Sequence, residues 1–461
     1  MRPTIVAWIL APLSAVALLV AVHVARSADA KPTSPVVWDE EEFAFVRRMV
    51  ADTYVDELSE TQSRDAFYAA VDGYVRSLPD EYNDFIPPEE YRKWVDDTAG
   101  HYAGVGVKID VLEKEGLKIA GLYPGGPAAT AGLRIGEVIT HVAGRSLAEV
   151  DLSKPENIRV LKGAVGSAVV VTVKTSAVKS PAAKDAPESA VPALRQVTIV
   201  RGDIRPTTVF PRRLGKDGKV GYLRISEFVE TTPADFDRAL DGMVADGVTA
   251  LVVDLRSNGG GVLPATVRIA DRFIRAGDIV RMTGRARNTR RTESARADDT
   301  IPDHLGLVVL VDGHTASASE VFAGCIQDHR RGVVLGTRTY GKFLVQNITE
   351  VPGRDAAVKL TSARYVTPNG RSYARDPKHP ETPAGLPPDV VVDLTPEDRK
   401  KLAQAFDNQE EAVWSAPLPF PEVPADWLDP QLERALELIG QNLLLQDIRD
   451  EKPGTATPRK G

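Results

Sequence analysis

A serine and a lysine between residues 306 and 346 are spaced so that together they could carry out acyl transfer. Leu307 to Val311 is a short apolar run that ends in Asp-Gly, a pattern typical of a buried strand closed by a turn. Ser317-Ala-Ser-Glu320 fits the capping box of a helix start, and apolar residues follow at helical spacing: Val321, Phe322, Cys325 and Ile326. Ser317 is therefore predicted at a strand-to-helix turn, where unpaired N–H groups would stabilise an oxyanion.

Lys342 is the candidate base for this serine. The short apolar run Val333 to Leu335 leads into a glycine-flanked turn that carries Lys342, and Gln346 follows four residues later. A serine nucleophile needs a base within hydrogen-bond reach, and a lysine can serve when it is neutral. Because a free lysine has a pKa of about 10.4, neutrality near pH 7 requires a shift of about three units, or about 4 kcal/mol. Burial can supply this shift, and suitable apolar neighbours are Tyr340, Phe343 and Leu344.

Taken singly, these residues also have structural explanations. A serine at a helix start is usually a cap, and a lysine after glycine is usually a solvated loop charge. The complete string, TASASE, QDH, YGK and then glutamine, resembles the signature of the carboxyl-terminal processing (tail-specific) serine proteases. That resemblance implies Ser317 as nucleophile, Lys342 as general base and Gln346 as the residue that orients the lysine. Phe343 and Leu344 depart from the small residues common in the family at these positions.

Other assignments near Ser317 stay open. A Ser–His–acid triad would use His314 or His329, although a histidine three residues before the serine is poorly placed to reach its hydroxyl. Ser319 is an alternative nucleophile, but it lies on a different part of the first helical turn. Asp328 is either an acid near the site, as in some relatives, or a charge at a helix end.

A glycine-rich run supplies the second half of the predicted oxyanion hole. Ala250 to Leu255 is an apolar run typical of a buried strand, and Arg256-Ser-Asn-Gly-Gly-Gly261 follows it. The run resembles the family motif whose glycine N–H joins the N–H of the residue after the nucleophile. The resemblance implies Gly260 and Ala318 as donors, with Gly261 as the alternative. A glycine-rich strand-to-helix turn without catalytic function is the other interpretation.

Residues 100–203 are predicted to form a PDZ domain. Gly104, Val105, Gly106 and Val107 precede an alternating strand, and such a loop can offer N–H groups to the carboxylate of a peptide C-terminus. A short helix opened by proline and closed by glycine follows, at 127–132. The Ala/Pro/Ser-rich stretch from Lys174 to Leu194 is predicted to be a flexible insertion at a hairpin tip.

The remaining segments complete a predicted α/β protein. Residues 38–97 form an N-terminal helical segment with no predicted chemistry, in which Leu78-Pro-Asp-Glu-Tyr-Asn replaces the family's usual Asp-Pro-His-Ser. Residues 205–392 show βα alternation, which predicts an α/β core, and the resemblance implies that this core is the Ser–Lys peptidase. Residues 395–445 form a C-terminal helical tail. The resemblance implies a crotonase-like fold for the core, with the PDZ domain inserted.

Composition and the start of the chain bear on location and partners. The 461 residues, 43% of them apolar, are enough for two or three globular units, and a net charge of −7 argues against nucleic-acid binding. The single cysteine, Cys325, excludes an internal disulfide. Residues 1–30 are predicted to be a signal peptide or membrane anchor, with a charge-free run at 3–25 and a small-residue cleavage site at Ala28-Asp-Ala30. The protein is therefore expected to be exported, to the periplasm or the outer face of the cytoplasmic membrane.

The sequence favours a serine endopeptidase that recognises substrate C-termini through its PDZ domain. No metal or other cofactor is implied, since the histidines show no ligand spacing. The expected partners are proteins with accessible C-termini, while membrane association through residues 3–25, a homodimer and an adaptor protein are left open. The alternative is a catalytically inactive PDZ scaffold, although a scaffold would need neither the serine nor the lysine.

Overall fold

The computed structural model describes residues 40–152, 155–175, 194–215, 217–376, 379, 381–414 and 427–441. The chain divides into two compact units, Met1–Val71 and Asp72–Gly461. The predicted targeting segment at 1–30 and nearly all of the 174–194 insertion lie outside the described residues. None of the described helices combines the length and the apolar character needed to cross a membrane.

The N-terminal unit contains helix α2 (Glu40–Thr53) and most of α3 (Glu60–Arg76), as the helical prediction requires. Helix α2 buries none of its residues. Its apolar side chains Phe43, Phe45 and Val46 stay about half exposed, at 50%, 60% and 49%.

The helical prediction is wrong between α3 and the next helix. Asp84–Ile86 is a strand, β1, that pairs antiparallel with β18 (Ala356–Val366), and the helix resumes only at α4 (Pro88–Ala99). The reason is packing, because pairing with β18 buries Phe85 and Ile86. The turn that enters β1 runs from 77 to 83 and carries the residues that replace the family motif.

A six-stranded sheet forms the centre of the C-terminal unit, with the order β10-β11-β12-β15-β16-β19. Its strands are parallel except for the β10–β11 pair. The strands predicted at 220–225, 250–255, 307–311 and 333–335 are all present in it, within one residue at each end. The six strands, in the order β10, β11, β12, β15, β16 and β19, are Val209–Leu214, Val220–Ile225, Ala250–Asp254, Gly306–Val311, Val333–Gly336 and Val390–Val391. Because β12 and β15 are neighbouring parallel strands, the loops at their carboxyl ends meet at one edge.

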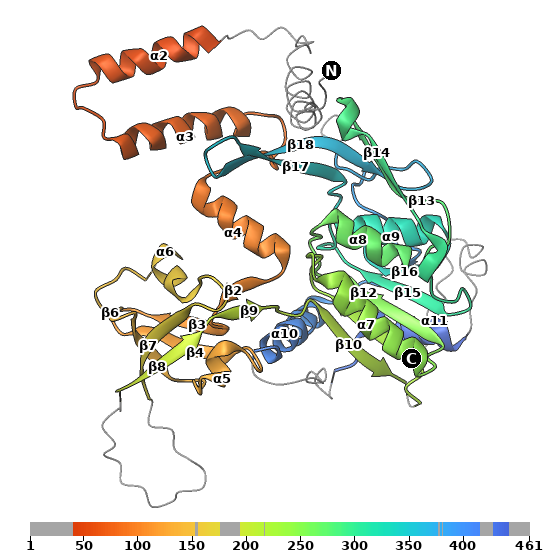
Figure 1. Ribbon diagram of the computed structural model, residues 1–461. Coiled ribbons are helices and arrows are strands. Elements are labelled where there is room, and N and C mark those ends of the chain that lie inside the picture. Colours follow the sequence, from red (N-terminus) through yellow and green to blue (C-terminus); the bar gives the residue numbers. More distant parts are fainter. Residues whose placement is uncertain are drawn as a thin grey trace, which may run out of the picture. The chain divides into compact units, whose positions relative to one another are not determined.

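Helices cover both faces of this sheet and give the α/β class that the sequence predicts. One face packs against α7 (Thr232–Ala245), α8 (Leu263–Asp271) and α9 (Ala318–Asp328), which lie alongside the strands in Figure 1. The other face packs against α11 (Pro430–Gly440). Helix α10 (Pro396–Ala412) also belongs to the predicted helical tail, whose residues 415–426 and 442–445 lie outside the described ranges.

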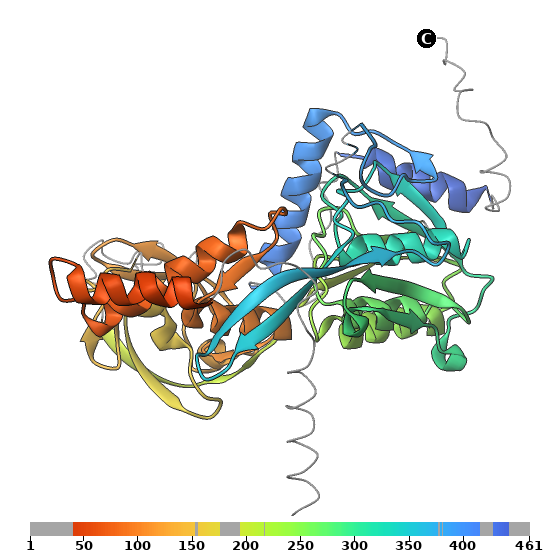
Figure 2. The ribbon, with the colours of Figure 1, turned by 90° about the horizontal axis from the view of Figure 1, so that it is seen from above.

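A second sheet carries the loop of the candidate base. Strands β1, β18, β13 and β14 follow one another in it, and β17 pairs with β18. Hairpin β17–β18 is the long twisted ribbon in Figure 2, and Lys342 lies two residues before it. The remaining elements are β13 (Asp278–Gly284), β14 (Arg291–Ser294), β17 (Leu344–Val351) and the short 3-10 turns Arg287–Thr289 and Ala297–Asp299.

The predicted PDZ region forms an antiparallel sheet with its own apolar core. Its order is β3-β4-β5-β7-β8, so β3 lies at one end of the sheet. Strand β2 (Tyr102–Gly104) pairs with β9 (Gly202–Ile204) where the chain enters and leaves this region. The other elements are β3 (Val107–Leu112), β4 (Gly116–Leu122), α5 (Pro127–Thr130), β5 (Val138–Val142), β6 (Arg145–Ser146), α6 (Pro155–Ile158), the 3-10 turn Arg159–Leu161, β7 (Ala168–Lys174) and β8 (Leu194–Val200).

Candidate active site

Ser317 lies at the turn between β15 and α9, where the sequence places it. Its backbone has φ 56° and ψ −119°, a region that residues other than glycine rarely adopt. Asp312 holds the turn, because its Oδ1 accepts hydrogen bonds from the N–H groups of His314 and Thr315, each at 3.0 Å. The hydroxyl of Thr315 donates to the carbonyl of Leu255 at 2.9 Å and so joins the turn to the end of β12. A strained serine held in this way is typical of a nucleophile on a strand-to-helix turn.

Gly260 packs directly against the serine turn. A Cβ atom at this position would lie 2.8 Å from the carbonyl oxygen of Ala316 and 2.9 Å from the Cβ of Ser317. Its φ of 107° also favours glycine. Nearby, the N–H of Ala316 donates to the carbonyl of Asn258 at 3.0 Å. The loops after β12 and β15 therefore meet, and only a glycine fits at 260.

The N–H groups predicted to form an oxyanion hole differ in how they are engaged. The N–H of Gly260 donates to Oδ1 of Asn258 at 2.8 Å. By contrast, within the part of the chain that the structure describes, neither Ala318 nor Gly261 uses its N–H in a hydrogen bond. Ala318 is the first residue of α9, so its N–H belongs to the helix terminus that favours negative charge. The free donors next to Ser317 are thus those of Ala318 and Gly261.

Glu320 ties the serine turn to the lysine loop. Its buried Oε2 accepts hydrogen bonds from the N–H of Ser317 at 2.9 Å and from the N–H of Lys342 at 2.8 Å. Its Oε1 accepts from the N–H of Gly341 at 2.7 Å and from the hydroxyl of Thr339. Burial raises the pKa of this carboxyl, although the four hydrogen bonds act in the opposite direction. The sequence identified Glu320 only as half of a capping box and gave no sign of its contacts with the lysine loop.

Lys342 is partly buried, and its pKa is lowered. The main cause is desolvation, and the positive charge of Lys359 adds to it, while Glu320 and Glu81 act in the opposite direction. The aromatic ring next to the ammonium group is that of Tyr82, with Nζ 4.8 Å from the ring centroid. The ring of Phe343, predicted as a neighbour, packs instead against Tyr373 with the centroids 5.4 Å apart.

The side chains of the three predicted catalytic residues are not linked by hydrogen bonds. Among the described residues, no such bond joins Oγ of Ser317 to Nζ of Lys342, although one carboxylate oxygen holds both backbones. Gln346 is in β17, opposite Thr361 of β18, and its Nε2 donates to the Thr361 hydroxyl at 3.4 Å. The structure thus brings the serine and lysine backbones together and shows the glutamine bound to a neighbouring strand.

The alternative catalytic residues have other surroundings. His314 is 82% exposed at its side chain, with only a 3.8 Å contact to Asp312. The ring of His329 contacts the carbonyl of Asp278 through Nε2, at 2.7 Å. Ser319 is fully buried, which fits packing rather than attack on a substrate. The exposure of His314, the backbone contact of His329 and the burial of Ser319 therefore favour neither a triad nor a second nucleophile.

Asp328, which the sequence left open, has a structural role at the end of α9. Its side chain is 0% exposed and pairs with Arg371. It also accepts a hydrogen bond from the N–H of Asn369 at 2.8 Å. The carboxylate therefore fixes the segment after β18 to the helix.

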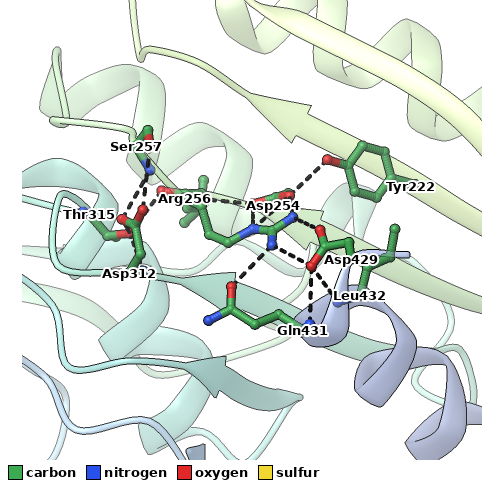
Figure 3. Close-up of polar contacts among 10 residues, drawn as sticks. Tyr222, Asp254, Arg256, Ser257, Asp312, Thr315, Asp429, Gln431 and Leu432 are labelled. Carbon is green, nitrogen blue, oxygen red and sulfur yellow. Dashed lines mark hydrogen bonds and ion pairs between the residues drawn. The ribbon is translucent and has the colours of Figure 1, made fainter. Parts of the chain in front are cut away.

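A buried ion network supports the loop after β12 (Figure 3). The guanidinium of Arg256 contacts Asp254 at 2.5 Å and Asp429 at 2.7 Å, and all three side chains are at most 6% exposed. The hydroxyl of Tyr222 donates to Asp254 at 2.7 Å, and Gln431 accepts from Arg256 at 3.0 Å. Burial pushes the pKa of Asp254 upward, but Arg256 outweighs it and the net shift is downward. In the sequence, Asp254 and Arg256 stand out only as members of the family motif. Nothing in the sequence pointed to Asp429, which lies 173 residues from Arg256.

The candidate peptide-binding loop lies before the edge strand β3. The carbonyl of Val105 accepts from the N–H of Ala128 at 2.9 Å, and that of Gly106 accepts from the N–H of Tyr123 at 3.0 Å. In the described chain, the N–H groups of Val105 and Gly106 donate no hydrogen bond. Gly106 has φ 72°, and a Cβ there would lie 2.9 Å from Ile204. Unpaired N–H groups beside a free sheet edge are what capture of a peptide carboxylate requires.

Comparisons with known proteins agree on one family. The family model for peptidase family S41 matches residues 219–392, and a PDZ-domain model matches residues 118–175. A carboxy-terminal-processing protease of Bartonella bacilliformis is 31% identical over 70% of this chain and 69% of its own length. A carboxyl-terminal-processing protease of a Picosynechococcus species is 31% identical over 79% of this chain and 86% of its own. Among solved structures, a photosystem II D1 C-terminal processing protease is 28% identical, covers 82% of this chain and all of its own, and has a TM-score of 0.42.

Proposed function

The chain belongs to peptidase family S41, the carboxyl-terminal-processing serine proteases, and from that premise we propose that it hydrolyses peptide bonds with a Ser317–Lys342 dyad. The observation that carries the proposal is the carboxylate of Glu320, which accepts from the backbone N–H groups of Ser317 and Lys342 at the same oxygen. The lowered pKa of Lys342 supports it as well, because desolvation favours the neutral amine that a base requires.

The proposed chemistry uses one proton carrier throughout. Neutral Lys342 takes the proton of the Ser317 hydroxyl while Oγ forms a bond to the scissile carbonyl carbon. Its ammonium then protonates the leaving amine as the C–N bond breaks, which leaves an acyl-serine. Lys342, neutral again, takes a proton from water, whose oxygen bonds to the acyl carbon of the ester. As the bond from this carbon to Oγ breaks, the lysine ammonium returns the proton to Oγ, which releases the carboxylic acid and restores Ser317. Gln346 would orient the lysine in this scheme if its side chain turned from Thr361, to which it donates at 3.4 Å.

The proposed oxyanion hole uses the N–H of Ala318 and a glycine N–H of the loop after β12. Each such donor is worth about 3 kcal/mol of transition-state stabilisation. Gly260 was the first choice from sequence, but its N–H is bound to Asn258 at 2.8 Å. Gly261, the alternative, has its N–H free. The close packing of Gly260 on Ser317 supports a role for this loop whichever glycine donates.

The PDZ region is proposed to select substrates by their C-termini. The free N–H groups of Val105 and Gly106 would bind the terminal carboxylate, and Gly104 and Val107 would complete the loop. The peptide would then add a strand to the edge of β3. Proteins with accessible C-termini are the substrates that this arrangement would take. An inactive scaffold is not favoured, since it would have no use for a buried carboxylate that joins Ser317 to Lys342.

We extend the proposal to the location of the enzyme. The sequence pattern of residues 1–30 supports export, to the periplasm or the outer face of the cytoplasmic membrane. Its substrates would then be exported proteins. Membrane association through residues 3–25, an adaptor protein and a homodimer remain parts of the hypothesis.

The test compares the full-length protein with Ser317→Ala, Lys342→Ala and the control His314→Ala on an unfolded protein with an apolar C-terminus. The proposal predicts cleavage by the wild type and by the histidine variant, and a loss of at least about 1,000-fold in the serine and lysine variants. Amidation of the substrate C-terminus should slow cleavage if the PDZ loop binds the carboxylate. Undiminished cleavage by Lys342→Ala would refute the dyad, and loss of cleavage in His314→Ala would favour a triad.

A further inference from the structure

The turn between α3 and β1, which the sequence left without chemistry, is fixed beside the candidate base. We call residues 79–83 the Tyr82 turn. Thr361 of β18 binds it twice, because its hydroxyl donates to Oδ1 of Asp80 at 3.0 Å and its N–H donates to Oδ1 of Asn83 at 2.8 Å. Within the turn, the N–H of Tyr82 donates to Oδ1 of Asp80 at 3.1 Å. Strand β18 therefore fixes the position of Tyr82, through Thr361, the residue that lies opposite Gln346.

Tyr82 presents its ring to the amine of Lys342, with Nζ 4.8 Å from the ring centroid. This distance is within the range in which an aromatic face attracts a cation. Among the described residues, Nζ of Lys342 makes no hydrogen bond or ion pair. The Tyr82 ring is thus the polarisable group that the structure places against the amine of the candidate base.

The charged and titratable groups around the amine come from three elements. Lys359 of β18 disfavours the positive charge of Lys342, while Glu320 of α9 and Glu81 of the Tyr82 turn favour it. Burial, together with interactions with Tyr340 and Glu81, raises the pKa of the Tyr82 phenol. Tyr82 therefore stays neutral across the working pH range, so its ring acts on Lys342 as a π face and not as a phenolate.

We propose that Tyr82 is a positioning residue for Lys342: the face of the Tyr82 ring holds the side-chain amine of Lys342 and stabilises its ammonium form. The inference rests on the proposed function, since it concerns the same lysine as general base. Burial and the ring then shift the pKa of Lys342 in opposite directions, because burial favours the neutral amine and the ring favours the cation. Loss of the ring at constant burial should let the lysine become neutral at a lower pH.

The test separates the ring from the hydroxyl and from simple packing. Tyr82→Leu keeps an apolar cover but removes the π face, and Tyr82→Phe keeps the face but removes the hydroxyl. Tyr91→Leu is the matched control, because Tyr91 stacks on Trp94 and binds Glu350, away from the lysine. Each full-length variant is checked for folding by its thermal melting. The pKa of Lys342 is then read by NMR of lysine labelled with ¹³C at Cε, with the signal assigned by its loss in Lys342→Arg.

The expected result is a pKa of Lys342 that falls by about 0.5 to 1 unit in Tyr82→Leu and stays unchanged in Tyr82→Phe and Tyr91→Leu. The acidic limb of kcat/KM should move down by the same amount in Tyr82→Leu. An unchanged Lys342 titration in Tyr82→Leu, or an equal shift in Tyr82→Phe, would overturn the role of the ring. If the titration shifts as expected but the acidic limb does not follow, the ring contact stands and the proposed base is wrong.

Discussion

The turn that carries Ser317 and the loop that carries Lys342 share one carboxylate but differ in what holds their side chains. Around Ser317, Asp312, Thr315 and Gly260 fix a strained backbone, so the serine has little freedom. Around Lys342 the backbone is fixed by Glu320, but the amine is held by a tyrosine face and by no hydrogen bond among the described residues.

The two halves of the candidate site therefore differ in how firmly each proposed catalytic residue is fixed. Ser317, the proposed nucleophile, lies in a strained turn beside the free N–H of Ala318. The backbone of Lys342, the proposed base, is fixed by Glu320, while its amine contacts the ring of Tyr82. We therefore expect mutations on the serine side to act on stability and kcat, and mutations beside the lysine to act on the pH profile.

Outside the proposed dyad itself, the largest effect is expected at Glu320, whose carboxylate contacts both the serine turn and the lysine loop. All four groups that contact its carboxylate are hydrogen-bond donors. In Glu320→Gln the side-chain amide nitrogen is a donor too, so the donors that it faces would lose their acceptor. Each buried donor left unsatisfied costs about 1 to 3 kcal/mol. Because relieving this cost would move the serine turn and the lysine loop out of alignment, we expect kcat/KM to fall by about 100-fold or more. The exposed Glu397, paired with Lys401, gives the control Glu397→Gln. Activity of Glu320→Gln within twofold of the wild type would show that the shared carboxylate does not align the dyad.

A smaller effect, confined to the serine side, is expected at Asp429. In Asp429→Asn, Arg256 keeps Asp254 but loses a buried charged partner, and we expect about 2 kcal/mol less stability in urea unfolding. Because Arg256 precedes the glycine loop, kcat should fall less than tenfold, with the Lys342 titration unchanged. Asp246→Asn breaks a surface pair with Arg213 and is the control, worth at most about 1 kcal/mol. Equal stability losses in the two variants would contradict a supporting role for the buried network.

The sequence predicted the parts of the site that depend on local pattern. The strand before Ser317, the helix after it and the lysine turn follow from apolar periodicity, glycine and capping signals. The residue roles came from the family resemblance and stay predictions, while the structure shows that Gly260 packs against Ser317.

Features that depend on tertiary packing were missed. Strand β1 looked helical because its pairing with β18 involves residues more than 270 positions away. A separation of 260 positions likewise hid the contact of Tyr82 with Lys342, and Asp429 carried no local sign of its link to Arg256. The bond from Gly260 to Asn258 also changes the balance between the two oxyanion candidates; it is a local contact, in which an asparagine side chain accepts from the N–H two residues on, and it was overlooked in the sequence.

The most direct test of the account is the pH dependence of the rate at which a fluorophosphonate labels Ser317. This single-turnover reaction needs no natural substrate and reports how readily the serine hydroxyl gives up its proton. The account predicts a rate that rises with pH along one ionisation lying below the ordinary lysine pKa, because burial lowers the pKa of Lys342. It also predicts that Lys342→Ala loses this ionisation and labels at least about 100-fold more slowly. Labelling of Lys342→Ala at the wild-type rate and with the same pH profile would contradict the Ser–Lys dyad.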